Sequence, residues 1–469
     1  MSVQNSDTPL RMSSYTIPVK LEDEEGKYML IHGYTGAIDI VSEELLDQIK
    51  FPATTDKTND LLQILINRGY ITTRTRSEEQ NIVFKISQIM HDRIKALAQN
   101  FVIVVTYNCN FRCPYCFEER ERKDSSCQVV ISKKMVDEIF SAIENLETGK
   151  AKRSNIITLY GGEPLMRQNK NIVEYIVKTG KSNGFAFDAI TNGYDLDAYI
   201  DLLGPGLIET IQITIDGTKE HHNKKRIHIT DENTFDKIIS NIKIAVSKKV
   251  RIIIRVNIDE TNESDVESLK LYLENILLLP NDNIRLYASP IVKNSSIKEH
   301  DDEELRFITS QQFSKIIKRN TTFKYCKDFG VTQTIYDAMK NKKPIRFRPV
   351  YCGAQTGAYV FDAYGNIYPC LETVGNEDRR IGSITRNGIN WFEKEVNYWR
   401  SYSITGKRCI CCKYALFCGG GCLARRLNND SSSCDYFRLS YPKYVNNAYN
   451  SFIRYNNLKY NNNEEKSRK

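Results

Sequence analysis

"FVIVVTYNCNFRCPYCFE", residues 101–118, joins a short apolar run to a loop with three cysteines, Cys109, Cys113 and Cys116. A short apolar run bounded by polar residues indicates a buried β-strand. A structural zinc site takes four ligands, and disulfides need an even number of cysteines. The stretch therefore predicts a strand followed by a metal-binding loop in which one ligand position is open.

Short apolar runs continue after this strand and alternate with helical patterns. Nearly continuous apolar strands alternating with helices predict a parallel sheet covered by helices. Six such units, with chemically active residues just after the strands, predict an α/β fold with a partial (β/α)6 barrel. An open sheet would produce the same pattern. The later runs are at residues 156–160, 185–190, 210–215, 251–258 and 284–292.

A smaller unit precedes the barrel pattern. Residues 14–72 read as three short strands followed by two amphipathic helices, which predicts a small α+β, winged-helix-like domain. After the barrel the cysteines become dense, and the end of the chain is rich in Asn, Tyr and Lys, so we expect its last dozen residues to be disordered. The expected divisions are a recognition-like domain with a linker at 1–99, the barrel at 100–330, a cysteine-rich domain at 331–440 and a tail at 441–469.

Composition limits where the protein works and what it binds. Charged residues make up 26% of the 469, and no apolar run has transmembrane length. The N-terminus lacks the apolar core of a secretory signal, so we expect a cytoplasmic protein without a membrane partner. Thiols stay reduced there, and clustered cysteines then bind metal or do chemistry. The net charge of +8 fits solubility or an acidic docking partner, and no nucleic-acid motif or partner is expected.

The spacing Cys109-x3-Cys113-x2-Cys116, with Tyr115 before the last cysteine, resembles the radical S-adenosylmethionine (radical SAM) superfamily. The resemblance implies that the three thiolates hold a [4Fe–4S] cluster whose fourth iron binds S-adenosylmethionine (SAM). Reductive cleavage of that cofactor would then give a 5′-deoxyadenosyl radical. A zinc loop that borrows a distant fourth ligand is the alternative.

Other residues after the strands match the same family. The glycines of "YGGEP" (160–164) permit close backbone approach, and its glutamate can accept hydrogen bonds from an ammonium group. "TIDG" (214–217) offers a hydroxyl, and an arginine twelve residues beyond it suits a carboxylate. For the two asparagines, loop capping is at least as good an explanation. By the resemblance, the SAM contacts are Tyr115, Gly161, Gly162, Glu163, Asn192, Thr214, Arg226 and Asn257.

A second group of cysteines lies between residues 352 and 434. A hairpin around Gly365 in "YVFDAYGNIYPC" (359–370) would bring its first two members together. The seven positions resemble the SPASM extension of radical enzymes that modify peptides and proteins, which implies two auxiliary [4Fe–4S] clusters and three clusters in all. One or two zinc sites are the alternative. The resemblance assigns Cys352, Cys370 and Cys422 to the first auxiliary cluster, and Cys409, Cys412, Cys418 and Cys434 to the second.

The first auxiliary set has three cysteines for four irons. Cys411 and Cys326 are candidates for the fourth ligand by residue type only. If neither serves, the open iron could bind the thiolate of a substrate.

The N-terminal unit resembles the small domains that bind leader segments of ribosomally made peptides, often by adding a strand to a sheet edge. A plain structural cap on the barrel is the alternative. The favoured function is a radical SAM oxidoreductase that forms thioether crosslinks in a precursor peptide, with a flavodoxin or ferredoxin as reducing partner. Carbon–carbon crosslinking remains open.

Two functions compete with this interpretation. Sulfatase-maturing relatives, which make formylglycine, carry an aspartate directly after the cysteine that matches Cys370, and here that position is Leu371, followed by Glu372. About 100 residues also precede the radical motif, whereas those relatives often begin near it. A non-enzymatic metal scaffold would have no use for the "YGGEP" motif.

Overall fold

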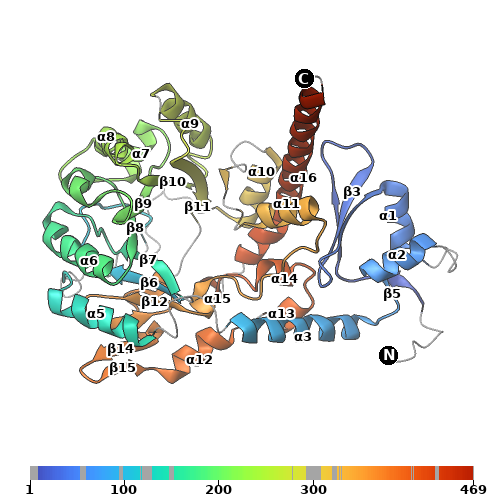
Figure 1. Ribbon diagram of the computed structural model, residues 1–469, viewed down its shortest axis with the longest axis horizontal. Helices are drawn as coiled ribbons and strands as arrows, with labels where there is room; N and C mark the ends of the chain where they lie inside the picture. The colour runs from blue at the N-terminus through green and yellow to red at the C-terminus, as the bar shows by residue number, and fades with distance from the viewer. Residues whose placement is uncertain are drawn as a thin grey trace.

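The computed structural model describes residues 9–52, 60–94, 99–116, 118, 129–146, 153–276, 278–291, 308–319, 325–326, 328, 330–402, 404, 406–427 and 432–467. In Figure 1 the N-terminal strands and helices lie on one side and the barrel strands with their helices on the other. The long C-terminal helix lies between them, and the cysteine-rich segment runs from below the barrel toward the N-terminal unit.

Six parallel strands form the centre of the barrel, as the apolar runs predict. They pair in chain order, so each strand–helix unit lies beside the next. Ile103, Leu159 and Ile213 are fully buried, because both faces of a parallel sheet are covered. The strands are β6 (Gln99–Val104), β7 (Arg153–Tyr160), β8 (Ala186–Thr191), β9 (Ile208–Thr214), β10 (Arg251–Ile258) and β11 (Ile284–Pro290).

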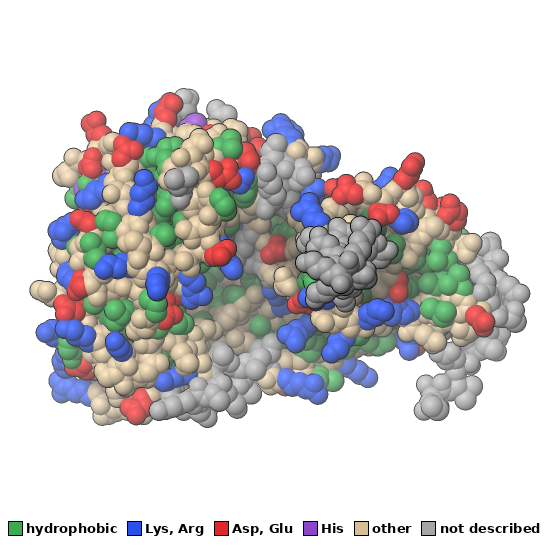
Figure 2. Space-filling model, turned by 45° about the horizontal axis from the view of Figure 1, so that its top comes forward, with side chains coloured by type: hydrophobic (Ala, Val, Ile, Leu, Met, Phe, Trp, Pro, Cys, Tyr) green, Lys and Arg blue, Asp and Glu red, His purple; other side chains and the backbone are tan. Residues whose placement is uncertain are grey.

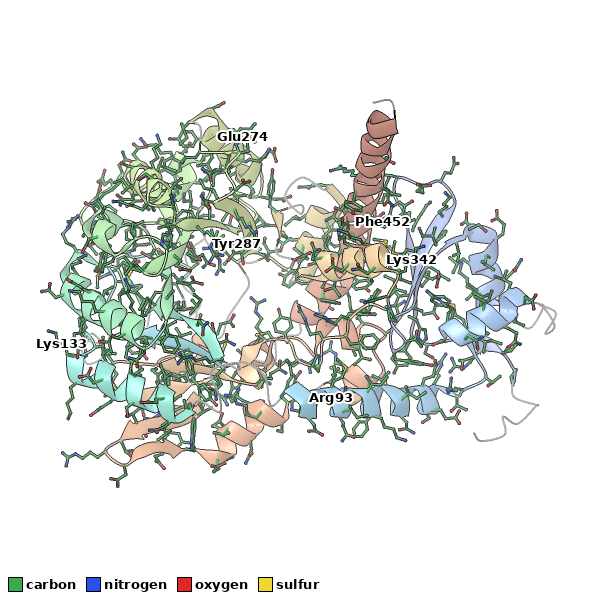
Figure 3. All side chains as sticks on the ribbon, viewed as in Figure 1. Arg93, Lys133, Glu274, Tyr287, Lys342 and Phe452 are labelled. Atoms are coloured by element: carbon green, nitrogen blue, oxygen red, sulfur yellow. The ribbon has the colours of Figure 1, made fainter. Side chains whose placement is uncertain are left out.

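Amphipathic helices cover the outer face of this sheet. In α5 (Lys133–Leu146) the buried side chains Val136, Ile139, Phe140 and Ile143 follow helical spacing, so they form one apolar face. Figure 3 shows Lys133 at the outer end of α5 and Tyr287 on the inner side of the barrel. The other covering helices are α6 (Lys170–Ser182), α7 (Lys219–Lys225), α8 (Thr234–Ser247) and α9 (Asp265–Asn275), with the 3₁₀ segment η5 (Leu196–Leu202).

The cysteine-rich segment extends the barrel sheet instead of forming a separate layer. Strand β12 (Ala358–Phe361) pairs in parallel with the outer edge of β6 and antiparallel with β13 (Asn366–Tyr368), so the predicted hairpin around Gly365 is confirmed. β14 (Gly382–Thr385) and β15 (Gly388–Trp391) complete a ten-stranded sheet. Because β12 occupies the edge of β6, β11 cannot pair there, and the barrel stays open.

The N-terminal unit is a three-stranded antiparallel sheet with helices packed on it. The order is β2 (Thr16–Lys20), β3 (Lys27–His32), β4 (Ile38–Ser42), and β1 (Arg11–Met12) pairs with β5 (Ile71–Thr72). Leu30, Leu46 and Leu62 are among the residues of its own hydrophobic core, which confirms the predicted strand-and-helix unit. Its helices are α1 (Glu43–Lys50) and α2 (Asp60–Arg68), and α3 (Arg76–Ile94) leads to the barrel.

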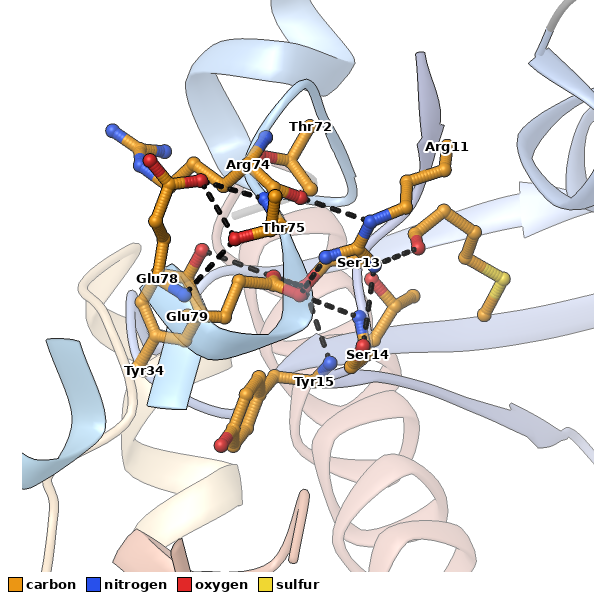
Figure 4. A network of polar contacts seen from close by, with 12 residues as sticks. Arg11, Ser13, Ser14, Tyr15, Tyr34, Thr72, Arg74, Thr75, Glu78 and Glu79 are labelled. Carbon is orange, nitrogen blue, oxygen red and sulfur yellow. Dashed lines mark hydrogen bonds and ion pairs between the residues drawn. The ribbon is translucent and has the colours of Figure 1, made fainter. Parts of the chain in front are cut away.

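A buried polar network joins α3 to the N-terminal strands (Figure 4). Glu79 is fully buried and accepts hydrogen bonds from Arg11 Nη2 at 2.6 Å, from Tyr34 Oη at 3.2 Å and from Ser13 Oγ. A buried carboxylate is tolerated when charged and polar donors satisfy it in this way. The network fixes the start of α3 against the unit that precedes it.

The C-terminal residues form one long helix, α16 (Ser432–Ser467), which begins within the predicted cysteine-rich range and continues into the predicted tail. Tyr441, Val445 and Ala448 are fully buried at helical spacing, and this apolar stripe holds the helix on the protein. Contacts with α10 (Ser310–Arg319) and α11 (Val331–Asn341) place it beside the end of the barrel. The remaining helices are α12 (Glu393–Ser401), α13 (Lys407–Ile410), α14 (Ala415–Cys418) and α15 (Leu423–Leu427).

Basic and acidic side chains are interspersed over the face shown in Figure 2, which is hollowed near its middle. The mixture fits the interpretation of the net charge as a contribution to solubility. None of the helices in the described ranges combines the length and apolarity that a membrane span requires.

Candidate functional site

The three-cysteine loop directly follows β6 at the carboxyl end of the barrel sheet. Cys113 is buried, while Cys109 and Cys116 are half-buried. The backbone N–H of Phe111 donates to Cys109 Sγ at 3.3 Å, and the N–H of Cys116 donates to Cys113 O at 3.2 Å. The structure thus gathers the three thiols in one turn-rich loop at the strand end, where barrel folds carry their chemistry.

The "YGGEP" loop after β7 is interlocked with the cysteine loop. Gly162 N–H donates to Thr106 O and Glu163 N–H to Asn108 O, both at 2.9 Å. A Cβ at Gly161 would overlap Thr106 O, and one at Gly162 would overlap Tyr107 O. The close approach that these glycines permit is therefore to the neighbouring loop, and their contact with SAM remains a prediction.

Glu163 lies in the protein interior, with 1% of its surface exposed. Its carboxylate accepts hydrogen bonds from Leu165 N at 2.9 Å, Thr191 Oγ1 at 2.6 Å and Asn192 N at 2.6 Å. Burial raises its pKa to about 7, although these hydrogen bonds act in the opposite direction. Glu163 thus ties the loop after β7 to the loop after β8.

Asn192 is used within the protein in the way the capping alternative predicts. Its Nδ2 donates to Asn110 Oδ1 at 2.8 Å, and its Oδ1 accepts from Tyr194 N at 2.9 Å. Because Asn110 belongs to the cysteine loop, Asn192 braces that loop from β8. A contact with SAM is untested.

Tyr115, Arg226 and Asn257 meet at Asp216, a residue that the sequence reasoning missed. Asp216 is fully buried, and it accepts hydrogen bonds from Tyr115 Oη and from Asn257 N, the latter at 3.0 Å. Arg226 Nη1 donates to Tyr115 Oη at 3.3 Å. Burial raises the pKa of Asp216, while the Arg226 guanidinium acts to lower it. Thr214 lies at the end of β9, two residues before this carboxylate.

Arg226 has donor capacity that the described protein does not use. Its guanidinium carbon lies 5.2 Å from the centre of the Phe111 ring, and its Nε is buried without a hydrogen-bond partner among the described residues. An unsatisfied buried donor is costly, so a bound anionic or polar group near it would be stabilised. Asp216, the residue that the sequence reasoning missed, is part of the quoted "TIDG" motif, and that motif was the signal that could have identified it.

The second auxiliary set surrounds a cavity. Its four cysteines, together with Cys411, line a space of about 330 Å³. Among the residues that the structure describes, no three His, Cys, Asp or Glu side chains lie close enough to hold a single metal ion. Four cysteine thiolates are a ligand set of both iron–sulfur clusters and structural zinc sites, so an auxiliary cluster here stays a prediction. The four cysteines are Cys409, Cys412, Cys418 and Cys434.

The first auxiliary set is gathered near the predicted hairpin. Burial raises the pKa of Cys370, and the nearby charges of Glu372, Cys352 and Cys422 raise it further. The three predicted cysteines are therefore close to one another, with Glu372 beside them. Cys352 is the exposed member of the set.

Neither candidate for a fourth ligand is placed with this set. Cys411 lines the second cavity and accepts a hydrogen bond from Gln80 Nε2 at 3.3 Å. Cys326 forms a backbone bridge with Ala288 of β11. Glu372 was noted in the sequence but not considered as a member of the site.

The comparisons with known proteins bear mainly on the barrel residues. Residues 103–273 match the family profile of the Radical SAM superfamily. The chain is 31% identical over 170 residues to a putative glycyl-radical enzyme activating enzyme of Methanocaldococcus jannaschii, covering 36% of this chain and 58% of that protein. It is 24% identical over 379 residues to a cysteine-type anaerobic sulfatase-maturating enzyme of Clostridium novyi, covering 72% of this chain and 92% of that protein.

Among solved structures, native anSMEcpe with bound AdoMet and Cp18Cys peptide has a TM-score of 0.56 at 17% identity. The likeness covers 75% of this chain and 99% of that one, and at this identity it shows a shared fold. The chain spans less than two thirds of the length of each of the first curated relatives that it matches. Their whole-protein activities therefore do not transfer directly.

Proposed function

Because residues 103–273 match the profile of the Radical SAM superfamily, we propose that this protein is a radical SAM enzyme that modifies a ribosomally made peptide. The observation that carries the proposal is the N-terminal unit, which has its own core and a sheet edge, on β4, that pairs with no described strand. It sits against the second cysteine set and precedes the barrel in the chain. Such a unit suits capture of a peptide leader by strand addition.

The two edges of the N-terminal sheet differ. Next to β2, Asn446 of α16 donates to Lys20 O at 3.1 Å and accepts from Glu22 N at 2.8 Å. No described strand pairs with the outer edge of β2 or of β4, and Arg68 Nη2 donates to Ile38 O at 2.8 Å at the start of β4. On that strand, Ile40 leaves 46% of its surface exposed. The edge of β4 is therefore the better place for an added strand.

The unit is attached to the loop that carries the second cysteine set. Tyr15 Oη donates to Ile410 O, between Cys409 and Cys412. A Cβ at Gly33 would lie 2.6 Å from Lys413 O, so the two backbones are in close contact. A leader held by this unit would direct the following peptide residues toward the auxiliary cysteines.

Cys109, Cys113 and Cys116 would hold the radical-generating cluster, and Arg226 would bind SAM. The bound cluster and SAM would supply a radical that removes a hydrogen atom from carbon. The loop after β7 and Asn192 keep the cysteine loop in place. Cys352, Cys370 and Cys422 would hold a first auxiliary cluster with an open iron for a substrate thiolate, whose negative charge the metal favours.

Thioether formation is the proposed outcome. It joins a sulfur to a carbon and removes one hydrogen atom from each. The hydrogen from carbon leaves to the deoxyadenosyl group, and the sulfur side loses one proton and one electron, which an auxiliary cluster would accept. The Clostridium novyi relative keeps formylglycine formation as the second candidate. Leu371 stands where the sulfatase-maturing pattern has an aspartate, which favours the first. Carbon–carbon crosslinking is the third candidate outcome, and a flavodoxin or ferredoxin is the proposed electron donor.

The leader proposal is tested by substituting the β4 edge. Ile40→Asp should weaken binding of a precursor peptide about tenfold or more, because a charge replaces an apolar contact, a loss on the order of 1.5 kcal/mol. Leu271→Asp is the matched control, since Leu271 on α9 is 52% exposed and far along the chain in the barrel. The precursor should be encoded near this protein. Equal affinity in both variants would contradict the proposal.

The chemistry is tested by mass spectrometry of the peptide. A thioether product should have lost two hydrogen atoms per bond and retained its sulfur, whereas formylglycine from cysteine loses the sulfur. A cysteine-containing peptide should also change the electron paramagnetic signal of the first auxiliary cluster, and a serine peptide should not. If both peptides leave the signal unchanged, the open iron is not the sulfur site, and carbon–carbon crosslinking becomes the better proposal.

A further inference from the structure

We propose that Arg426 sets the reduction potential of the second auxiliary cluster. The inference rests on that cluster, which belongs to the proposed function, and goes beyond it by assigning a positioning residue outside the cysteines. Nothing in the cysteine spacing points to this arginine.

Arg426 contacts two of the four cysteines around the second cavity. Its Nη2 donates to Cys409 Sγ at 3.3 Å and lies 3.6 Å from Cys434 Sγ. These cysteines are 25 positions apart in the chain, and Arg426 also lines the cavity. One guanidinium therefore bridges two sulfur ligands that come from different helices.

The guanidinium is held in place independently of the thiols. It lies 5.4 Å from the centre of the Tyr402 ring, and Tyr402 Oη donates to Gly420 O at 2.9 Å. Its backbone N–H donates to Cys422 O at 3.3 Å, at the start of α15. Arg426 thus stands one helical turn from a cysteine of the first set while its side chain reaches the second.

The electrostatic consequence has a definite sign. A cluster held by four thiolates becomes more negative when it accepts an electron. A fixed cation that donates to the ligand sulfurs stabilises the more negative state, and hydrogen bonds to the sulfurs are known determinants of cluster potential. Arg426 should therefore make the second cluster easier to reduce, and so a better acceptor for the electron released during the reaction.

Arg425 is a matched control because it is adjacent in sequence and acts on the other set. Burial raises the pKa of Cys422 to about 11, and the charge of Arg425 is among the influences that lower it. Arg426 lines the cavity of the second set, whereas Arg425 is not among the described residues around that cavity. Substituting each arginine in turn separates a local effect from a general loss of positive charge.

The test is a redox titration of the full-length, iron-loaded protein followed by electron paramagnetic resonance. Replacing Cys109, Cys113 and Cys116 by alanine removes the radical-generating cluster, and Cys418→Ala identifies the signal of the second one. In this background, Arg426→Gln should shift the midpoint of that signal to a more negative potential, while Arg425→Gln should leave it in place. Arg426→Lys should give a smaller negative shift, because a single ammonium cannot bond both sulfurs as the planar guanidinium does.

Iron content is measured first, so that the two proposals can fail separately. A protein without a cluster in this cavity would overturn the proposed cofactor set together with the inference. A loaded cluster whose midpoint is unchanged in Arg426→Gln, or equally shifted in Arg425→Gln, would overturn the inference alone. If Arg426→Gln does not fold, Arg426→Lys decides: an unchanged midpoint overturns the proposal.

Discussion

At the scale of single residues, the structure separates side chains that hold the loops from those that can hold a ligand. Glu163 and Asn192 use their side chains to form hydrogen bonds with neighbouring loops. Arg226 keeps a buried Nε without a partner among the described residues, beside the aromatic ring of Phe111. Among the predicted SAM contacts, Arg226 is therefore the residue whose buried donor a bound ligand would best satisfy.

Arg226→Ala should weaken SAM binding roughly ten- to a hundredfold, because a charge-assisted hydrogen bond contributes about 1.5–3 kcal/mol. Isothermal titration or equilibrium dialysis of the iron-loaded protein would measure it. Lys225→Met is the control, since Lys225 pairs with the buried Asp259 at 2.7 Å instead of facing Tyr115. That variant should lose stability but not SAM affinity. An unchanged affinity in Arg226→Ala would remove this residue from the cofactor site.

Glu163→Gln should lower the free energy of unfolding by about 1–3 kcal/mol, because an amide has one acceptor oxygen where the carboxylate uses two. The pH dependence has a definite sign. Since the folded pKa is raised to about 7 from 4.5, the unfolded chain releases its proton first, and this group makes stability fall as pH rises between those values.

Chemical denaturation at several pH values would test this prediction. The difference in slope between wild type and Glu163→Gln isolates the contribution of the one carboxyl. Stability that rises with pH through this window in the wild type relative to the variant would show that the hydrogen bonds outweigh burial.

At the scale of elements, the loop after β6 and the loop after β7 act as one structure. Two backbone hydrogen bonds join them, and two glycines allow their chains to touch. A small stretch of sequence thus serves the fold and the candidate site together. This explains why the "YGGEP" motif, which the sequence analysis interprets as a cofactor contact, also has a structural role.

Gly162→Ala should separate these loops, because its Cβ would overlap the carbonyl oxygens of Tyr107 and Asn108. We expect a loss of about 1–3 kcal/mol in unfolding free energy, and less iron bound by the three-cysteine loop. Gly406→Ala is the control, because nothing lies within 4 Å of its Cβ position. Denaturation and iron analysis would measure both effects, and equal results for the two variants would contradict the interlock.

At the scale of the whole molecule, the C-terminal helix joins the two ends of the chain. Lys443 pairs with Glu22 at 2.7 Å, and Asn446 bonds the backbone on both sides of Leu21. These contacts with α16 therefore hold the N-terminal unit in one position relative to the auxiliary cysteines. A fixed position is what delivery of a peptide from a leader site would require.

Asn446→Ala should release the N-terminal unit. The side chain is 3% exposed, and its removal takes the partners from the partly buried Glu22 N–H and Lys20 C=O, at a cost of about 1–3 kcal/mol. Limited proteolysis should then cut near residues 9–52 before the barrel. Asn450→Ala is the control, because its bond to Asp23 is exposed and contributes little. Cleavage at the same rate in both variants would show that other contacts hold the unit.

Local patterns in the sequence determined most of the elements. Apolar runs predicted all six barrel strands, because the periodicity of a strand is a property of neighbouring residues. The two cysteine groups, which the structure gathers around the second cavity and beside Glu372, were assigned by the resemblance to the SPASM extension.

Contacts between distant segments were decided only by the tertiary structure. The pairing of β12 with β6, the reach of Arg426 to Cys434, the meeting of Tyr115 with Asp216 and the course of α16 each join residues that no local pattern relates. The domain divisions and the individual SAM contacts stay predictions. The physical reason is that burial and hydrogen-bond partners depend on which segments pack together, and a side chain of one type can meet many partners until the chain is folded.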